Sequence, residues 1–92
     1  MEKSIILPWS KENIEKSPEE CGVLMLRTTP VNGDITIIKT SINLKKDLLD
    51  IIEKGVSAEV KYFDWLTTED TKTAEEAKLE LKKKYHLEGI LD

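Results

Sequence analysis

The stretch from Gly33 to Gly55 constrains the fold most, because its apolar spacing changes partway from that of a strand to that of a helix. Residues 35–40 are rich in β-branched side chains, which are common in strands. Strict alternation would place Ile35, Ile37 and Lys39 on one face of this strand. A strand that leads directly into a helix can present side chains beside a cleft, so this stretch is the first place to look for chemistry.

After Ser41 the apolar residues recur at intervals of three and four, which is the period of one helix face. They are Leu44, Leu48, Ile51 and Ile52. Either Ser41 or Asn43 can cap the start of this helix, and Gly55 can end it. The spacing therefore predicts an amphipathic helix that ends at Lys54.

The rest of the chain contains two further strand patterns and two helix patterns. Residues 21–28 and 57–66 have strand character, and Asn32-Gly33 suits the turn that follows the first of them. Ser10 can cap a short helical turn. Thr73 and Glu76 form a capping box for a last helix that ends near His86.

This order of elements predicts an α+β fold with a small three-stranded antiparallel sheet flanked by helices. We expect a single domain over residues 1–92, with a core of about 18–86 and an N-terminal packing segment, 1–17. Residues 4–7 fit either an edge strand or a packed tail. The last helix has an apolar stripe of Ala74, Ala77, Leu81 and Tyr85, and Leu87, Ile90 and Leu91 can fold back onto the core.

Charge and cysteine content limit the possible functions. Charged residues make up 35% of the chain and the net charge is −4, so we expect no general attraction to nucleic acid. Cys21 is the only cysteine, which excludes an intrachain disulfide and a multi-cysteine metal site. No apolar run approaches a membrane span, and the charged start does not fit a signal peptide, so we expect a cytoplasmic protein.

Four segments together resemble the GIY-YIG nuclease domain, the module of homing endonucleases and of an excision-repair nuclease subunit. They are PEECGVLMLR, NGDITIIKTSINLKKDLLDII, VKYFDWL and TAEEAKLELKKKY, which cover roughly Pro18 to Tyr85. The most specific part is the rhythm from Gly33 to Lys46, in which a glycine is followed by Asn-Leu and two basic residues. The resemblance implies a GIY-YIG-like fold.

The resemblance also assigns active-site positions. The first motif of the family ends in a tyrosine that positions or deprotonates the attacking water, and Leu24 stands there. The second motif has a tyrosine followed two residues later by a glycine, and Ile37 and Lys39 occupy these places. The family arginine, which stabilises charge on the phosphate, falls at Asp47.

The metal-binding glutamate of the family falls at Lys78 in an ungapped alignment through Leu81 and Tyr85, although a slip would place Glu76 or Glu80 there. Phosphodiester cleavage needs a cation that polarises the phosphate, together with stabilisation of the developing charge. Leu24 and Ile37 carry no protons to transfer, and a charged lysine does not ligate a cation. The resemblance therefore implies a retained scaffold without nuclease activity, metal or other cofactor.

Two functions remain open. The first is a non-catalytic binding or interaction domain with an unknown protein partner or with itself, for which Trp65 is a candidate contact if it is exposed. The second is a nucleic-acid-binding module that has lost cleavage, with contacts from lysines. These are Lys39, Lys45, Lys46 and Lys78. We expect no membrane partner.

Other polar residues have simpler explanations. His86 near a helix end complements the helix dipole, and carboxylates such as Glu75 and Glu76 are expected at a helix start. A cation site involving Glu69 and Asp70, and phosphate binding by Lys82, Lys83 and Lys84, are the weaker alternatives.

Overall fold

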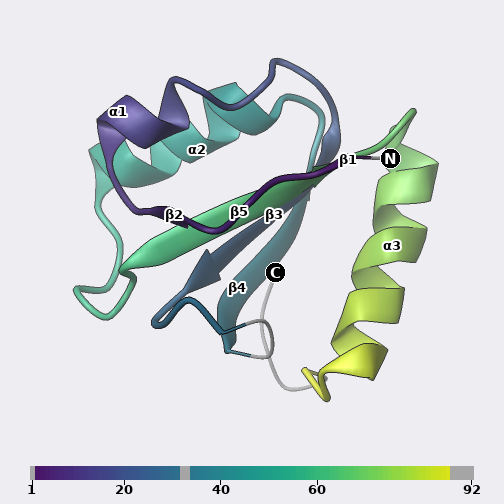
Figure 1. Cartoon of the computed structure of the whole chain (residues 1–92). Coiled ribbons are helices and arrows are strands. Elements are labelled where there is room, and N and C mark those ends of the chain that lie inside the picture. The colour runs from purple at the N-terminus through teal and green to yellow at the C-terminus, as the bar shows by residue number, and fades with distance from the viewer. Residues whose placement is uncertain (1, 32–33, 88–92) are drawn as a thin grey trace.

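The computed structural model describes residues 2–31 and 34–87, and these form an α+β structure, as expected (Figure 1). Its elements in chain order are β1 (Glu2–Lys3), β2 (Leu7–Pro8), α1 (Lys11–Ile14), β3 (Gly22–Arg27), β4 (Ile35–Ser41), α2 (Leu44–Lys54), β5 (Tyr62–Thr67) and α3 (Thr71–Lys84). The sheet lies between α1 and α2 on one side and α3 on the other. Among the described helices, none combines the length and the apolar character needed to cross a membrane.

The sheet has more strands than the sequence predicts. All pairs are antiparallel and the order is β1–β5–β3–β4, with β2 also paired to β5, so the described chain forms a sheet of five strands rather than three. The two additional strands come from the N-terminal segment: Lys3 pairs with Leu66, and Leu7 pairs with Phe63. Pro8 suits this edge because proline has no N–H to donate to a further strand.

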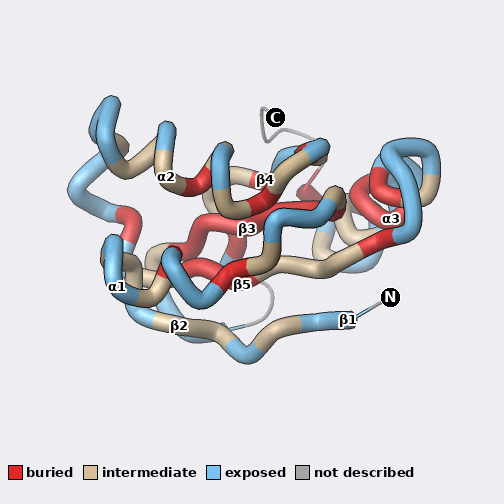
Figure 2. The backbone as a smooth tube through the Cα atoms, turned by 90° about the horizontal axis from the view of Figure 1, so that it is seen from above, coloured by how far each residue is buried: buried red, intermediate tan, exposed pale blue. Residues whose placement is uncertain are grey.

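The central strand β3 separates two apolar cores. All of its residues are buried, and Figure 2 shows it in red through the middle of the molecule. Its side chains alternate between the two faces, as the sequence predicts. The α2-side core contains Ile14, Leu24, Leu26, Leu44, Leu48, Val60 and Phe63. The α3-side core contains Val23, Met25, Ile35, Ile38, Ala74, Ala77 and Leu87.

Strand β4 departs from strict alternation near its start. Leu26 pairs with Ile37 whereas Arg27 pairs with Ile35, so Thr36 is an extra residue in β4. Such a bulge shifts the alternation by one residue. Ile35 consequently belongs to the α3-side core while Ile37 packs against the α2-side core. The prediction that Ile35 shares a face with Ile37 is therefore wrong.

The first two helices begin at caps that the sequence allows. The hydroxyl of Ser10 accepts a hydrogen bond from the backbone N–H of Asn13 at the start of α1. At the start of α2 the cap is Asn43 and not Ser41, since its side chain accepts from the backbone N–H of Lys46. Gly55 ends α2 with φ at 87°, a left-handed value that glycine adopts without the cost paid by other residues.

The last helix begins earlier than predicted. Its cap is Asp70, whose carboxylate accepts from the backbone N–H of Thr73 at 2.7 Å, so the prediction of Thr73 as the cap is wrong. This hydrogen bond holds the pKa of Asp70 below its ordinary value of 3.8. The predicted apolar stripe is confirmed, with Ala74 and Ala77 buried in the α3-side core.

The segment before β5 is a turn rather than a strand. The backbone N–H of Val60 donates to the carbonyl of Ser57, and β5 starts only at Tyr62, so the predicted strand start at Ser57 is wrong. Leu87 is buried as predicted. The predicted turn at Asn32-Gly33 and the packing of residues 90 and 91 lie outside the described residues.

Candidate functional site

Leu24 and Ile37 lie on neighbouring strands beneath α2. Leu24 is fully buried in the α2-side core, and Ile37 is half-buried against the same core. Leu24 pairs with Lys39 across the two strands, and Ile37 pairs with Leu26. The structure thus brings Leu24 and Ile37 to the same face of the sheet, where both pack as apolar side chains.

Asp47 is held at the junction of β4 and α2. The hydroxyl of Ser41 donates to the carboxylate of Asp47 at 2.5 Å, and the same hydroxyl accepts from the backbone N–H of Asn43 at 3.1 Å. Ser41 is buried and Asp47 is half-buried. The carboxylate of Asp47 therefore has a structural partner that fixes the start of the helix. The sequence indicates Ser41 only as a possible cap, so this contact was not predicted.

Lys78 lies on the other side of the sheet from these three residues, because it belongs to α3. Its side chain is 8% exposed, and its Nζ lies 3.2 Å from one carboxylate oxygen of Glu75. The other oxygen of Glu75 accepts from the hydroxyl of Thr40 on β4 at 2.7 Å. The positions assigned by sequence thus divide into a group of three on the α2 side and a single residue on the α3 side.

The three other candidate lysines lie near the start of α2. Lys39 is exposed on β4, on the face that Leu24 shares, while Lys45 is half-buried and Lys46 is exposed in the first turn of the helix. A helix N-terminus attracts anions, but Asp47 already places a carboxylate in that first turn. The positive charge of this region is therefore partly offset.

Trp65 contributes to packing rather than to an exposed aromatic surface. It is half-buried against the α2-side core, and its ring centre lies 5.8 Å from that of Phe63. Trp9 meets the same Phe63 edge-on with 5.4 Å between ring centres. Such aromatic clusters add stability beyond their buried area, so these three rings have a structural role.

The fold of the chain is similar to that of a solved structure. The chain matches the N-terminal GIY-YIG endonuclease domain of UvrC from Thermotoga maritima, solved as a point mutant bound to its catalytic divalent cation. The TM-score is 0.66 with 22% identity, over 84% of this chain and 93% of that one. The chain has a GIY-YIG-like fold. No protein-family model matches the sequence, and no curated protein matches it either.

The candidate cation ligands on α3 are Lys78 and, in the alternative alignments, Glu76 and Glu80. Lys78 stands where a ligand is implied, and an ammonium group has no lone pair to give to a metal while it is charged. Glu76 and Glu80, the alternatives on α3, are both exposed. Within residues 2–31 and 34–87, no three His, Cys, Asp or Glu side chains are grouped so that they could hold a metal.

The two remaining polar candidates are not joined to this region by any hydrogen bond among the described residues. The half-exposed thiol of Cys21 donates to the carbonyl of Thr68 at 3.2 Å. His86 is exposed just beyond α3, with φ at 57°. Cys21 therefore has a local hydrogen-bond partner, and His86 lies at the C-terminal end of α3.

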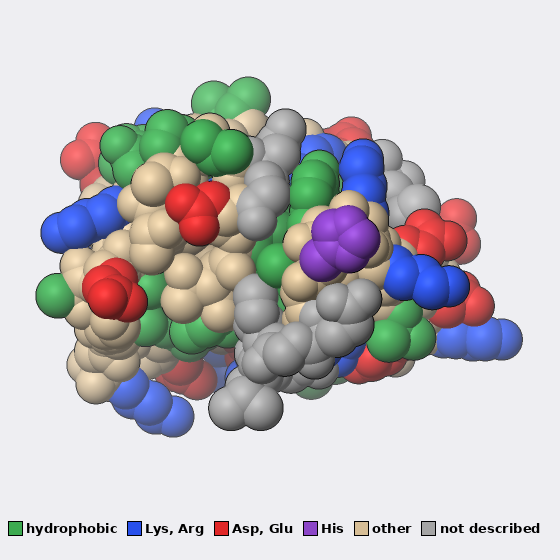
Figure 3. Space-filling model, turned by 90° about the horizontal axis from the view of Figure 1, so that it is seen from below, with side chains coloured by type: hydrophobic (Ala, Val, Ile, Leu, Met, Phe, Trp, Pro, Cys, Tyr) green, Lys and Arg blue, Asp and Glu red, His purple; other side chains and the backbone are tan. Residues whose placement is uncertain are grey.

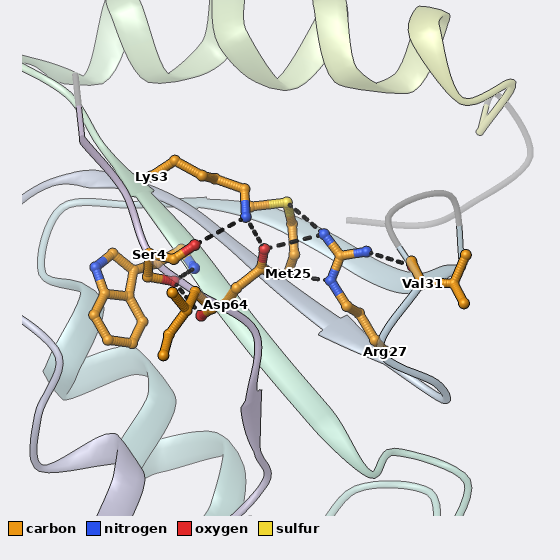
Figure 4. Close-up of polar contacts among 8 residues, drawn as sticks. Lys3, Ser4, Met25, Arg27, Val31 and Asp64 are labelled. Carbon is orange, nitrogen blue, oxygen red and sulfur yellow. Dashed lines mark hydrogen bonds and ion pairs between the residues drawn. The ribbon is translucent and has the colours of Figure 1, made fainter.

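A buried ionic cluster inside the fold was not predicted from the sequence (Figure 4). Arg27 donates through Nε to one oxygen of Asp64 at 2.8 Å and through Nη2 to the other at 3.1 Å, and both side chains are at most 1% exposed. Lys3 from β1 also donates to Asp64. The sequence contains one indication of this cluster. Arg27 stands two residues after Met25, and Asp64 stands two residues before Leu66, so alternation puts each charged residue on the same face of its strand as an apolar one.

Proposed function

We propose that this chain is a non-catalytic binding or interaction domain on a GIY-YIG-like scaffold and that it has no nuclease activity. The observation that carries the proposal is the apolar packing of Leu24 and Ile37, which the resemblance assigns to the catalytic tyrosines and which lie in or against the α2-side core. Lys78, to which the resemblance assigns the cation ligand, lies across the sheet from these two residues, and its ammonium group neutralises the neighbouring carboxylate of Glu75. A cation in this place would be repelled by Lys78.

The chemistry of the assigned residues supports the same proposal. Leu24 and Ile37 cannot transfer a proton or orient a water molecule, and their side chains pack into or against the α2-side core. Asp47 would repel a phosphate that an arginine should stabilise, and its carboxylate is already bonded to Ser41. The chemistry of cleavage therefore lacks its proton carriers, its cation site and its charge stabilisation together.

A cleavage assay tests the proposal. The purified protein is incubated with supercoiled plasmid and with single-stranded DNA, in Mg²⁺ or Mn²⁺ and in EDTA, and we expect no difference in nicking between the metal and EDTA samples. Metal-dependent cleavage that is lost in Glu76→Gln or Glu80→Gln would contradict the proposal. The Glu59→Gln variant, which changes an exposed carboxylate before β5, serves as the matched control.

A second candidate function is nucleic-acid binding without cleavage. The observation that favours it is the exposure of Lys39 and Lys46 beside the first turn of α2. Lys78 is a poor contact for this role because its ammonium is buried against Glu75. A fluorescence-anisotropy titration with labelled DNA or RNA at low ionic strength tests it: binding that weakens steeply with salt and in Lys39→Gln/Lys46→Gln supports this function, and no binding removes it.

A further inference from the structure

An open hollow lies between the N-terminal segment and the C-terminal half of α3. Its volume is about 600 Å³, within the range of binding sites for ligands of moderate size. Ile6, Leu66, Leu81 and Tyr85 form apolar walls, and Lys3 and Lys84 contribute the charged groups. Viewed from below, green apolar side chains are visible next to the purple histidine at the end of α3 (Figure 3).

The apolar walls of this hollow are only partly covered by the protein. Leu66, Leu81 and Tyr85 pack against the α3-side core and are half-buried, and Ile5 at the rim is 75% exposed. A contiguous apolar surface with a polar rim is typical of an interaction site rather than of ordinary exposed surface.

The charge at one end of the hollow is positive. Among the three members of the buried cluster, Asp64 carries one negative charge while Arg27 and Lys3 carry two positive charges. An ammonium group has three N–H donors. Lys3 gives one to Asp64 and one to the carbonyl of Ser4, and its side chain is 41% exposed. Lys3 is therefore a charged and partly exposed group in the wall of the hollow.

The opposite wall is also positive, although the chain as a whole has a net charge of −4. Lys84 lines the hollow, with its Nζ 5.4 Å from the centre of the Tyr85 ring. A ligand that matches the hollow must therefore combine apolar groups with at least one negative charge. Because the hollow is open, such a ligand keeps one side in water.

We propose that this hollow binds an acidic, amphipathic peptide segment of a partner protein. Apolar side chains of the peptide pack on Leu66, Leu81 and Tyr85, while its carboxylates meet Lys3 and Lys84. A peptide with one apolar and one polar face satisfies both the walls and the open side, as in other groove-binding peptides. This inference rests on the proposed function, because it names the kind of partner that a non-catalytic interaction domain would hold.

The test is an NMR titration of the ¹⁵N-labelled protein with the peptide acetyl-Asp-Leu-Glu-Glu-Leu-Ile-Asp-Leu-amide. We expect saturable amide shifts at residues 3–6, at Leu66 and at residues 81–85. One control peptide has lysine in place of each acidic residue, and a second has serine in place of each Leu and Ile. Neither control is expected to saturate, since the first reverses the charge and the second removes the apolar face.

Paired variants distinguish peptide binding in the hollow from binding elsewhere on the surface. Lys84→Glu is expected to weaken peptide binding about tenfold, because it puts a negative charge beside the carboxylates of the peptide. Lys83→Glu makes the same change at an exposed neighbour that does not line the hollow, and we expect less than a threefold effect. Leu81→Gln is compared in the same way with Leu79→Gln, whose side chain is 61% exposed on α3.

Several outcomes would overturn the inference. These are the absence of saturable shifts, equal binding of the lysine peptide, or equal effects of Lys83→Glu and Lys84→Glu. Binding to vesicles of phosphatidylcholine and phosphatidylserine, without binding of the peptide, would assign the hollow to a membrane surface instead. The cleavage assay stays independent: loss of peptide binding without cleavage overturns only the hollow as the site, whereas metal-dependent cleavage contradicts the proposed function.

Discussion

At Gly22, close packing alone determines which amino acid the chain can have, although the position is two residues before Leu24, one of the assigned site positions. A Cβ atom at this position would lie 2.0 Å from the backbone oxygen of Leu66 and 3.1 Å from Cδ1 of Leu44. The backbone oxygen belongs to the neighbouring strand β5 and cannot move away by a change of rotamer. The sheet therefore requires a glycine at position 22, the first residue of the segment Gly22-Val23-Leu24, whether or not the domain has any catalytic activity.

Gly22→Ala is accordingly expected to lower the free energy of unfolding by about 3 kcal/mol or more, since overpacking against backbone is relieved only by separating the strands. The matched variant is Gly55→Ala, where a Cβ meets nothing within 4 Å and the cost comes only from the positive φ. That cost is about 1–2 kcal/mol. Urea denaturation measures both, and a smaller loss for Gly22→Ala than for Gly55→Ala would contradict the packing argument.

The buried ion pair gives a second prediction for a single residue. Asp64→Asn removes the carboxylate charge that Arg27 contacts with two hydrogen bonds in a site that is 1% exposed, so we expect a loss of about 3–5 kcal/mol in the free energy of unfolding. The control is Asp34→Asn, because Asp34 is exposed and accepts hydrogen bonds from the hydroxyls of Thr28 and Thr29. Denaturation curves should show a change below about 1 kcal/mol for the control.

If Asp64→Asn lowered the free energy of unfolding no more than Asp34→Asn does, the ionic cluster would not be important for stability. Alternation along β3 puts Arg27 on the face of Val23 and Met25, but it does not indicate which residue Arg27 binds. The partner depends on how β5 lies against β3, and the spacing within either strand contains no information about that register.

At the scale of the elements, the helices were predicted better than the strands because 3.6-residue periodicity extends over many residues. The amphipathic face and both ends of α2 follow from Leu44, Leu48, Asn43 and Gly55. In β4, by contrast, the inserted Thr36 reverses the side of Ile35, and a bulge of one residue leaves no mark on composition.

The start of α3 was misplaced because two capping signals overlap. Thr73 followed by Glu76 fits a capping box, but Asp70 followed by Thr73 offers a carboxylate to the same backbone N–H. The longer helix is the one that forms, since its cap still leaves Ala74 and Ala77 on the buried face.

The Asp70 cap predicts a dependence of stability on acid. The pKa of Asp70 is lowered in the folded chain by the backbone hydrogen bond from Thr73, so its ionised form is stabilised by folding. This contribution is fully present above the unfolded value of 3.8 and is lost as the pH falls through the lower folded-state pKa.

Asp70→Asn keeps a capping oxygen but cannot ionise. We therefore expect its melting temperature to lie below that of the parent chain at pH 7 and to approach it below pH 3.8. Thermal unfolding followed by circular dichroism across this range measures the difference. Two curves that stay parallel through the acid range would show that the carboxylate of Asp70 is not coupled to folding.

At the scale of the whole molecule, the sequence predicted the central hairpin, the two larger helices and the two-sided core, whereas it did not predict the sheet edge. β1 and β2 are each only two residues long, which is too short for alternation to be visible. Their pairing with β5 depends on contacts with residues more than fifty positions away, such as Ser4 N–H to the carbonyl of Trp65 at 2.9 Å. Long-range contacts of this kind determine where a segment packs without leaving a local pattern.

The sites assigned by resemblance show the same limit. Periodicity placed Leu24 and Ile37 on strands and Asp47 and Lys78 on helices, but only the packing of α3 determines that Lys78 lies across the sheet from the other three. The bonds that fix Asp47 to Ser41 and Glu75 to Thr40 likewise join different elements.

Removing residues 1–8 tests whether the N-terminal segment is part of the folded unit. The deletion removes β1 and β2, opens the edge of β5 and takes Lys3 away from Asp64, while the Arg27–Asp64 pair stays. With several backbone hydrogen bonds lost at about 0.5–1.5 kcal/mol each, we expect a destabilisation of about 3 kcal/mol. Open strand edges also promote association, so sedimentation velocity should detect a larger share of oligomers for the deletion than for the full chain.

Lys3→Gln separates the loss of the Lys3 charge from the loss of the two edge strands, because it removes the charge but keeps β1 and β2. We expect this variant to keep the oligomeric state of the full chain and to lose less than half of the stability that the deletion loses, since Arg27 still binds both oxygens of Asp64. If the deleted chain unfolded at the same temperature as the full chain and did not associate, the edge pairing would contribute nothing to the fold. In that case the wall of the hollow beside α3 would not be fixed either. Lys3 and Ile6 line this wall, and the pairing of β1 and β2 with β5 that holds them would contribute nothing to stability.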